Sequence, residues 1–224
     1  MRAALRRFVP GHVRTALRAP TRSLALWLAS RLLLLFGRGK VPSKRMIRVL
    51  RYDWGNESFA ASEPLLREIS AQALATRGAV LETGSGISTV LLSYVLPADR
   101  VLLALEHDDA WVERVNRYSR RGIQPAINSP IVNYGKYDWY QMPLTPPAGI
   151  GLLICDGPPG WTRGGRYGAM PQLSRFLFRG ATILFDDINR SDEKEVLDQW
   201  VDEFSITYSL TSLDERVFAI AELP

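Results

Sequence analysis

Cysteine and histidine are scarce in this chain of 224 residues. The single cysteine, Cys155, excludes an internal disulfide framework and a cysteine-based zinc cluster, and it favours a reducing compartment such as the cytoplasm. The two histidines, His12 and His107, are too few for a histidine-rich metal site. With 46% hydrophobic and 23% charged residues, the composition also excludes collagen-like, mucin-like and wholly disordered chains.

Acidic residues are absent from the first 51 positions, where 13 lysines and arginines lie. The other 173 residues hold 15 basic and 23 acidic side chains, so the net charge of +5 combines a +13 segment with a −8 body. A net acidic body is poorly suited to bind nucleic acid, because neutralisation of phosphates by basic side chains supplies most of the affinity for nucleic acid. We therefore predict a basic arm at 1–52, a globular domain at 53–224 and no nucleic-acid partner.

A long hydrophobic run is missing as well. The apolar stretch at 24–36 has 13 residues and contains Arg31, whereas a helix that spans a bilayer needs about 20 residues. One interpretation is an interfacial helix, with residues 13–40 contacting anionic lipids on the inner membrane face. The alternatives are a helix that packs on the body or on a second subunit, and a signal or transit segment. The sequence does not distinguish these alternatives or indicate an oligomeric state.

From about residue 57, short apolar runs alternate with longer amphipathic stretches. The predicted strands lie at 79–81, 101–105, 131–132, 150–155 and 181–185. The predicted helices lie at 62–76, with Ser62 as cap, and at 88–96, 109–120, 167–178 and 193–204. Two further runs, 205–210 and 216–221, indicate a terminal hairpin. This order predicts an α/β fold: a doubly wound mixed sheet with helices on both faces and an antiparallel pair at one edge.

Acidic residues follow most of the predicted strands. They are Glu82, Glu106, Asp156 and the pair Asp186-Asp187. In open α/β sheets, ligands bind outside the carboxyl ends of the strands. A single acid there is commonly structural, but this set, beside a glycine-containing turn, predicts a functional site.

The turn after the first strand carries Gly84 and Gly86, which let the backbone pass close to a ligand. A nicotinamide-binding turn would have a third glycine where Thr89 stands. Glu82 beside the helix start would repel a pyrophosphate but suits a cationic ligand. Glu106 is placed to accept hydrogen bonds from both hydroxyls of a ribose.

Two segments of the sequence resemble the cofactor site of class I S-adenosylmethionine-dependent methyltransferases. They are Val80-Leu-Glu-Thr-Gly-Ser-Gly-Ile-Ser-Thr89 and Leu105-Glu-His107. Residues 155–160 and 186–190 are similar to a bacterial branch of small-molecule methyltransferases, and the resemblance covers about residues 54–224. It implies a seven-stranded sheet with a reversed last strand, an adenine contact from the aromatic segment 137–140, and S-adenosylmethionine as cofactor. The implied cofactor-binding residues are Glu82, Gly84, Ser85, Gly86, Thr89 and Glu106.

Asp156, Asp186 and Asp187 fall where metal-assisted members of that family hold magnesium, so the resemblance implies a Mg²⁺ site that would stabilise a substrate alkoxide. Without a metal, three clustered carboxylates need another counter-charge. The arginines at 163, 166 and 190 provide this alternative, and the sequence leaves both interpretations open. The general base is Asp156 or Asp187 by position.

The loop at 157–166 contains four glycines and two arginines, and we expect it at the mouth of the site. Arg166 and Arg190 are candidates for binding an anionic group of the substrate. Together these observations predict a methyltransferase that acts on a small molecule or glycan, at an oxygen atom. The rival hypotheses are an NAD(P)-dependent oxidoreductase on a similar sheet and a non-catalytic, membrane-tethered nucleotide-binding protein. The sequence does not define the methyl acceptor.

Overall fold

The computed structural model describes residues 32–33, 37–55, 60–213 and 216–224. Most of the basic arm lies outside these residues, so the membrane interpretation of 13–40 stays a prediction. In the described part of the chain, no helix is long and apolar enough to cross a membrane.

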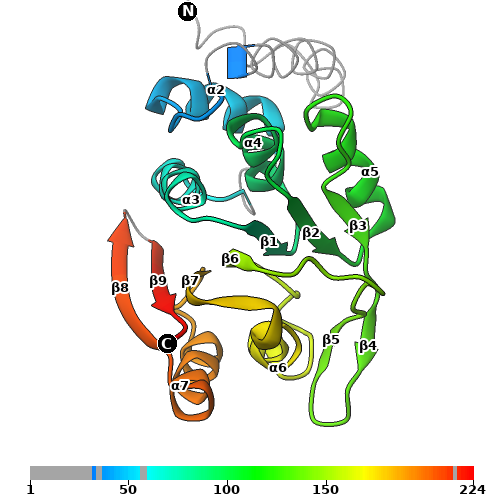
Figure 1. The fold of residues 1–224 in the computed structure, drawn as a ribbon, viewed down its shortest axis with the longest axis vertical. Coiled ribbons are helices and arrows are strands. Elements are labelled where there is room, and N and C mark those ends of the chain that lie inside the picture. The colour runs from blue at the N-terminus through cyan, green and yellow to red at the C-terminus, as the bar shows by residue number, and fades with distance from the viewer. Residues whose placement is uncertain (1–31, 34–36, 56–59, 214–215) are drawn as a thin grey trace, which may run out of the picture.

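A seven-stranded sheet forms the centre of the molecule, in the order β3-β2-β1-β6-β7-β9-β8 (Figure 1). Its parallel strands are β1 (Ala79–Thr83), β2 (Leu102–Glu106), β3 (Ala126–Asn128), β6 (Ile150–Cys155) and β7 (Leu177–Phe185). The terminal hairpin pairs β8 (Thr207–Leu213) with β9 (Arg216–Glu222), and β9 runs antiparallel to β7. The predicted mixed sheet, with its reversed last strand and terminal hairpin, is therefore confirmed.

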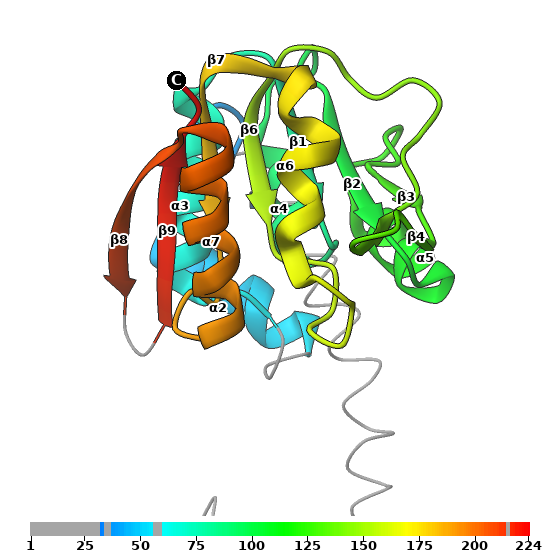
Figure 2. The same cartoon turned by 90° about the horizontal axis from the view of Figure 1, so that it is seen from below.

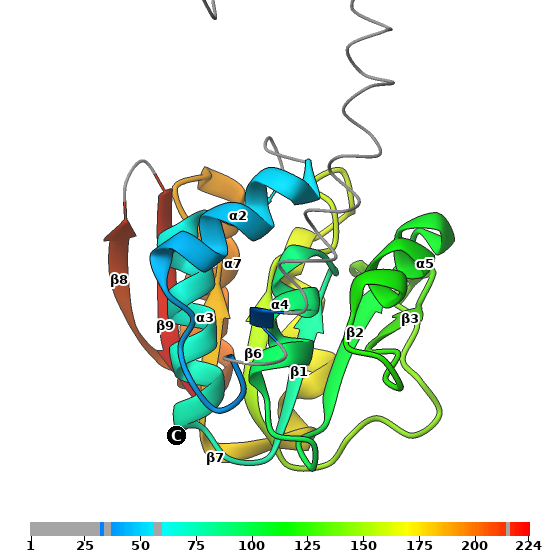
Figure 3. The same cartoon turned by 90° about the horizontal axis from the view of Figure 1, so that it is seen from above.

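Helices cover both faces of this sheet. One face carries α2 (Lys44–Trp54), α3 (Glu63–Ala75), α4 (Ile87–Val95) and α5 (Asp109–Tyr118), which lie in front of the sheet in Figure 3. The other face carries α6 (Ala169–Leu173) and α7 (Ser191–Phe204), as Figure 2 shows. The predicted cap of α3 is present, because Ser62 Oγ accepts a hydrogen bond from the Leu65 N–H at 3.3 Å.

The core lies in two hydrophobic layers, one on each face of the sheet. Every residue of β1 and β6 is buried, as expected for central parallel strands that helices cover on both sides. Leu33 and the α2 residues Ile47, Leu50 and Trp54 belong to the layer beneath α2–α5. The predicted boundary between 52 and 53 thus falls inside a helix that packs on the sheet domain.

The third predicted strand, 131–132, is a strand in the structure, but it lies outside the main sheet. The strand that pairs with β2 is β3 (Ala126–Asn128), whereas β4 (Ile131–Asn133) pairs with β5 (Asp138–Tyr140) in a separate hairpin. A side chain from α5 selects β3, because Asn116 bonds both backbone groups of Ala126, at 2.8 and 3.0 Å. Both segments are strands, and the contact with α5 places β3 beside β2.

The helix predicted at 167–178 was also wrong in part. The segment forms a 3-10 helix η2 (Gly165–Gly168), then α6, then a 3-10 helix η3 (Ser174–Phe176), and β7 begins at Leu177. Leu177 pairs with Ile150 of β6, which ends the helical segment. Tertiary pairing with the central strand therefore overrides the helical periodicity of residues 177–178.

Candidate functional site

A cavity of about 660 Å³ opens at the carboxyl ends of β1, β2, β6 and β7. Its walls include most of the site residues expected from the sequence: Gly84, Ser85, Gly86, Glu106, Asp156, Arg166, Asp187 and Arg190. The other three, Glu82, Thr89 and Asp186, lie beside the cavity and do not line it. The sheet thus gathers residues that are more than 100 positions apart in the chain.

The two glycines of the β1 turn have different roles. Gly84 has φ +80°, a conformation that strains any residue with a side chain, and a Cβ there would lie in tight contact, 3.3 Å from the Gly157 backbone nitrogen. Gly86 has an extended backbone, and a Cβ there would meet nothing within 4 Å. Gly84 is therefore required by the fold, whereas Gly86 leaves open space for a ligand.

Glu82 lies beneath this turn and is almost completely buried. The hydroxyl of Thr89 donates to its carboxylate at 2.6 Å, and the hydroxyl of Ser88 donates to its other oxygen. Thr89 Oγ1 also accepts a hydrogen bond from the Gly86 N–H at 3.0 Å. Burial raises the pKa of Glu82 to about 7, against the opposing effect of the two hydroxyl donors. Glu82 and Thr89 therefore anchor the turn and the start of α4.

Glu106 connects the turns that follow β1 and β2. Its Oε2 accepts hydrogen bonds from the backbone N–H and the hydroxyl of Ser85, both at 3.0 Å. Its Oε1 accepts from the backbone N–H groups of His107 and Asp108, at 2.8 and 3.1 Å. Because a carboxylate has about four acceptor positions, a ribose hydroxyl at Glu106 would replace the Ser85 hydroxyl. Glu106 can therefore bind a ribose hydroxyl once the Ser85 hydroxyl is displaced.

Aromatic side chains that the sequence analysis did not select form part of the cavity wall. Trp54 and Trp111 meet edge to face at 5.7 Å, and the Arg114 guanidinium lies over both rings. Trp111 Nε1 also donates to the Ser85 carbonyl at 2.7 Å. The sequence does place Trp111 in the first turn of α5, because Asp108 is a typical N-cap residue and accepts a hydrogen bond from the Trp111 N–H. No local signal marked Trp54, which reaches the cavity through the packing of α2.

The aromatic segment after β4 divides between core and cavity. Trp139 is fully buried in the hydrophobic core, whereas Tyr140 lines the cavity and is the member of this segment placed to contact a ligand. A Cβ at Gly157 would come within 2.4 Å of the Tyr140 hydroxyl oxygen, so Gly157 makes room for that ring. The glycine-containing loop reaches the mouth of the cavity through Trp161, which is 72% exposed.

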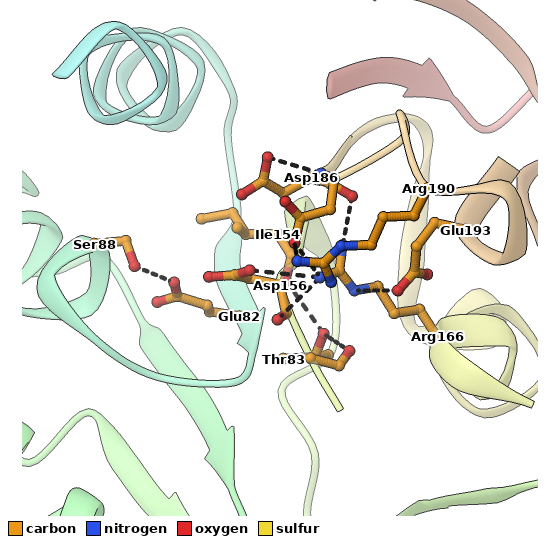
Figure 4. A network of polar contacts seen from close by, with 11 residues as sticks. Glu82, Thr83, Ser88, Ile154, Asp156, Arg166, Asp186, Arg190 and Glu193 are labelled. Carbon is orange, nitrogen blue, oxygen red and sulfur yellow. Dashed lines mark hydrogen bonds and ion pairs between the residues drawn. The ribbon is translucent and has the colours of Figure 1, made fainter. Parts of the chain in front are cut away.

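A network of charged residues forms the cavity wall at the ends of β6 and β7, with Arg166 at its centre (Figure 4). Arg166 is only 2% exposed. Its Nη2 lies 3.3 Å from Asp187 Oδ2 and 3.6 Å from Asp156 Oδ1, and its Nε lies 3.5 Å from Glu193 Oε1. Its Nη1 donates a hydrogen bond to the Asp186 carbonyl. Burial lowers the pKa of Arg166, but the surrounding carboxylates, with Asp156 first, raise it more, so the guanidinium stays charged.

Of the three arginines expected near the aspartates, two take part in this network. Arg190 lies 2.9 Å from Asp187 Oδ2, on the same oxygen that faces Arg166. Arg163 instead pairs with Asp138 at 2.8 Å, on the surface of the β4–β5 hairpin. Arg163 therefore ties the loop to β5 and does not supply the counter-charge.

Asp156 is the most accessible acid of the network, with 38% of its side chain exposed against 17% for Asp187. The pKa of Asp156 is raised well above its ordinary value, first because the surrounding protein removes water and then because of the negative charge of Asp186. Arg166 opposes this rise. Asp156 therefore presents a carboxylate with increased proton affinity to the cavity.

The donor set fits a divalent ion poorly. Asp156, Asp186 and Asp187 each offer an oxygen within 4.8 Å of the others, which suits a hard cation. However, Arg166 already contacts carboxylates of two of them and the backbone of the third. The magnesium site stays a prediction from the sequence that this arrangement does not favour.

No protein-family model and no curated protein sequence matches the chain. Similar solved structures include an O-methyltransferase from Bacillus cereus in complex with SAH, with a TM-score of 0.55, 12% identity, and coverage of 82% of this chain and 93% of that chain. A methyltransferase from Geobacter sulfurreducens has a TM-score of 0.51 at 12% identity, over 73% and 80% of the two chains.

A third similar structure is the O-methyltransferase TomG from Streptomyces achromogenes in complex with SAM. Its TM-score is 0.50 at 14% identity, with coverage of 74% of this chain and 82% of that one. At such low identity the likeness establishes the fold alone. Strand order, reversed last strand and these neighbours agree: the chain has the fold of the class I S-adenosylmethionine-dependent methyltransferases.

Proposed function

We propose that this protein is an S-adenosylmethionine-dependent methyltransferase that methylates an oxygen atom of a small-molecule or glycan acceptor. The observation that carries the proposal is the single cavity that joins two kinds of wall. One wall holds the glycine turn and Glu106, and the other holds Asp156, Asp187 and Arg166. The first suits a nucleoside, and the second suits a hydroxyl that must lose a proton.

At the nucleoside end, the chain's residues bind and orient the cofactor. Gly86 leaves the space beside the start of α4 open, and Glu106 offers the ribose a carboxylate acceptor at the end of β2. Tyr140 and Trp111 supply flat aromatic surfaces in the same cavity. The buried Glu82 holds the turn in place through Ser88 and Thr89.

When bound, S-adenosylmethionine supplies a methyl group whose bond to sulfur breaks as the acceptor oxygen attacks it. Asp156 receives the proton of the acceptor hydroxyl, because it is the more exposed candidate base and Asp187 Oδ2 already faces two arginines. Arg190, with 57% of its side chain exposed, is available to an anionic group on the acceptor. Alignment of acceptor and methyl group in the cavity accounts for much of the rate enhancement.

Thermal unfolding with S-adenosylhomocysteine, NADH or buffer tests the proposal. A ligand that binds only the folded state stabilises it by about 2.7 kcal/mol at a concentration of 100 times Kd. We expect S-adenosylhomocysteine to raise Tm and NADH to have no effect. No change with millimolar S-adenosylhomocysteine would contradict the proposal, and a shift with NADH alone would favour the oxidoreductase. Metabolite screening with labelled cofactor would then identify the acceptor.

We also propose that the basic arm places the enzyme peripherally on an anionic membrane. The charge pattern of the first 51 residues supports this, since 13 cationic side chains occur there without an acidic one. Deletion of residues 1–31 leaves Leu33 and α2 in place and is expected to abolish cosedimentation with anionic liposomes. Equal liposome binding with and without these residues would show that the arm is not the anchor.

A further inference from the structure

The carboxyl ends of β6 and β7 lie side by side, because Cys155 and Phe185 are paired in the sheet. The residues that follow are Asp156 on one strand and Asp186 and Asp187 on the other. Three carboxylates are thus brought within 4.8 Å of one another. Such a cluster requires a compensating positive charge, because like charges at this distance in a partly desolvated site destabilise one another.

Arg166 supplies that charge from within the chain. A single nitrogen, Nη2, faces Asp187 Oδ2 at 3.3 Å and Asp156 Oδ1 at 3.6 Å, and it donates to the Asp156 carbonyl at 3.3 Å. Nη1 donates to the Asp186 carbonyl, so the guanidinium contacts all three aspartates. The Phe185 ring lies 5.5 Å below it and η2 carries its backbone, which fixes its position.

A divalent ion would compete with Arg166 for the same oxygens. A metal bound at about 2.0–2.6 Å from Asp156 or Asp187 would lie within roughly 6 Å of Nη2, with both cations partly shielded from water. Arg166 cannot escape this repulsion by losing its proton, since guanidinium groups stay charged in proteins. Its burial and its two backbone acceptors also oppose a rotation away from the aspartates.

We propose that Arg166 takes the place of a divalent metal ion in this site and makes methyl transfer independent of metal. The guanidinium holds Asp156 and Asp187 at the acceptor end of the cavity, which both residues and Arg166 line. The acceptor proton passes to the Asp156 carboxylate and then to solvent, while the acceptor oxygen forms its bond to the methyl carbon and the carbon–sulfur bond breaks. This inference rests on the proposed function for its chemistry, but the cation that occupies the site is measured separately.

Thermal unfolding in Mg²⁺ and in EDTA is the direct test. Wild-type Tm is expected to be equal in both. Arg166→Met removes the charge at similar size, so the carboxylates released from Arg166 are expected to bind Mg²⁺ and raise Tm by roughly 3–6 °C at ten times Kd. Arg163→Met, from the same loop but paired at the surface, is expected to behave like wild type. A Mg²⁺-dependent rise of the wild-type Tm that Asp186→Asn abolishes would overturn the proposal.

A second measurement needs no variant and covers the case in which Arg166→Met does not fold. Wild-type protein is dialysed against Mn²⁺ and then against buffer, and its metal content is measured. We expect no stoichiometric manganese, and one ion per chain would overturn the proposal. Titration with S-adenosylhomocysteine in the same samples separates the two ideas: bound metal with cofactor binding refutes this inference alone, and metal independence without cofactor binding refutes the proposed function alone.

Discussion

The two ends of the cavity both hold strand-end acids, but they stabilise them in different ways. At the nucleoside end, Glu82 and Glu106 accept hydrogen bonds from hydroxyls and backbone N–H groups, and the basic side chain in contact is His107, whose Nδ1 lies 2.9 Å from Glu106 Oε1. At the acceptor end, Asp156 and Asp187 lie against Arg166. At Glu106, which lines the cavity, no arginine or lysine in the described interactions compensates the negative charge, whereas arginines compensate it at Asp156 and Asp187. In the proposed function, the first end would accommodate the cationic sulfonium and the second an anionic or hydroxyl-bearing acceptor.

The largest effect is expected at the acceptor end, from Asp156→Asn. Loss of a general base lowers kcat by about 10²- to 10⁴-fold. Affinity for S-adenosylhomocysteine is expected to change less than threefold, because the proposed nucleoside site lies at the other end of the cavity. Because the pKa of Asp156 is raised, its carboxylate form increases with pH, so wild-type kcat should rise with pH through that pKa. Steady-state kinetics and calorimetric titration measure both. A greater loss in Asp187→Asn than in Asp156→Asn would assign the base to Asp187.

Removal of the cation at that end should mainly lower stability. Arg166→Met leaves buried acids without their partner, which typically costs about 3–5 kcal/mol in the free energy of unfolding. Urea denaturation near pH 7 measures this loss. Arg163→Met is the matched control: the Arg163 side chain is 49% exposed, so a change below about 1 kcal/mol is expected. Equal effects of the two substitutions would show that Arg166 is not the centre of a buried network.

The acid held by neutral donors should make stability depend on pH. The folded pKa of Glu82, about 7, exceeds the ordinary glutamate value of 4.5, so folding takes up a proton and the stabilising contribution is lost as pH rises between these values. The loss amounts to at most about 3 kcal/mol. Glu82→Gln should flatten the decline in urea midpoint between those pH values, and the exposed Glu195→Gln should not. An unchanged decline in Glu82→Gln would place its origin elsewhere.

Substitution of Glu106, the proposed ribose acceptor, should have the smallest effect, confined to cofactor affinity and the local turns. Hydrogen bonds to a charged group contribute about 1.5–3 kcal/mol, so Glu106→Gln should raise Kd for S-adenosylhomocysteine by roughly 10- to 100-fold. Isothermal titration calorimetry measures this change. Glu113→Gln, an exposed position on α5, is the control and should leave Kd unchanged. If Glu106→Gln binds with wild-type affinity, the ribose lies elsewhere.

The parts of the fold that the sequence predicts well are those in which local pattern and tertiary environment agree. Buried central strands such as β1 and β6 need continuous apolar runs, and these runs stand out in any context. Acids that end those strands follow from the same pattern. In contrast, β3 depends on the Asn116 side chain, and the wall residue Trp54 depends on how α2 packs. Such contacts form only in the folded structure, and no local sequence pattern indicates them.

The arginines of the loop show the same limit within one short segment. Arg163 and Arg166 are three residues apart and chemically identical, yet one pairs on the surface with Asp138 and the other is buried among the aspartates. The difference arises where η2 turns Arg166 inward beneath the end of β7. The sequence shows that arginines near the aspartates could balance their charge, but only the folded backbone shows that Arg166, and not Arg163, does so.

Trp54 is shared between two parts of the molecule. It is the last residue of α2, the helix at the C-terminal end of the basic arm, and it also forms part of the cavity wall. When one structural element contributes to two binding events, the coupling between them is reciprocal. A surface that altered the packing of α2 would change cofactor affinity by some factor, and cofactor would change affinity for that surface by the same factor. Surface binding and cofactor binding would then depend on the same conformational equilibrium of α2.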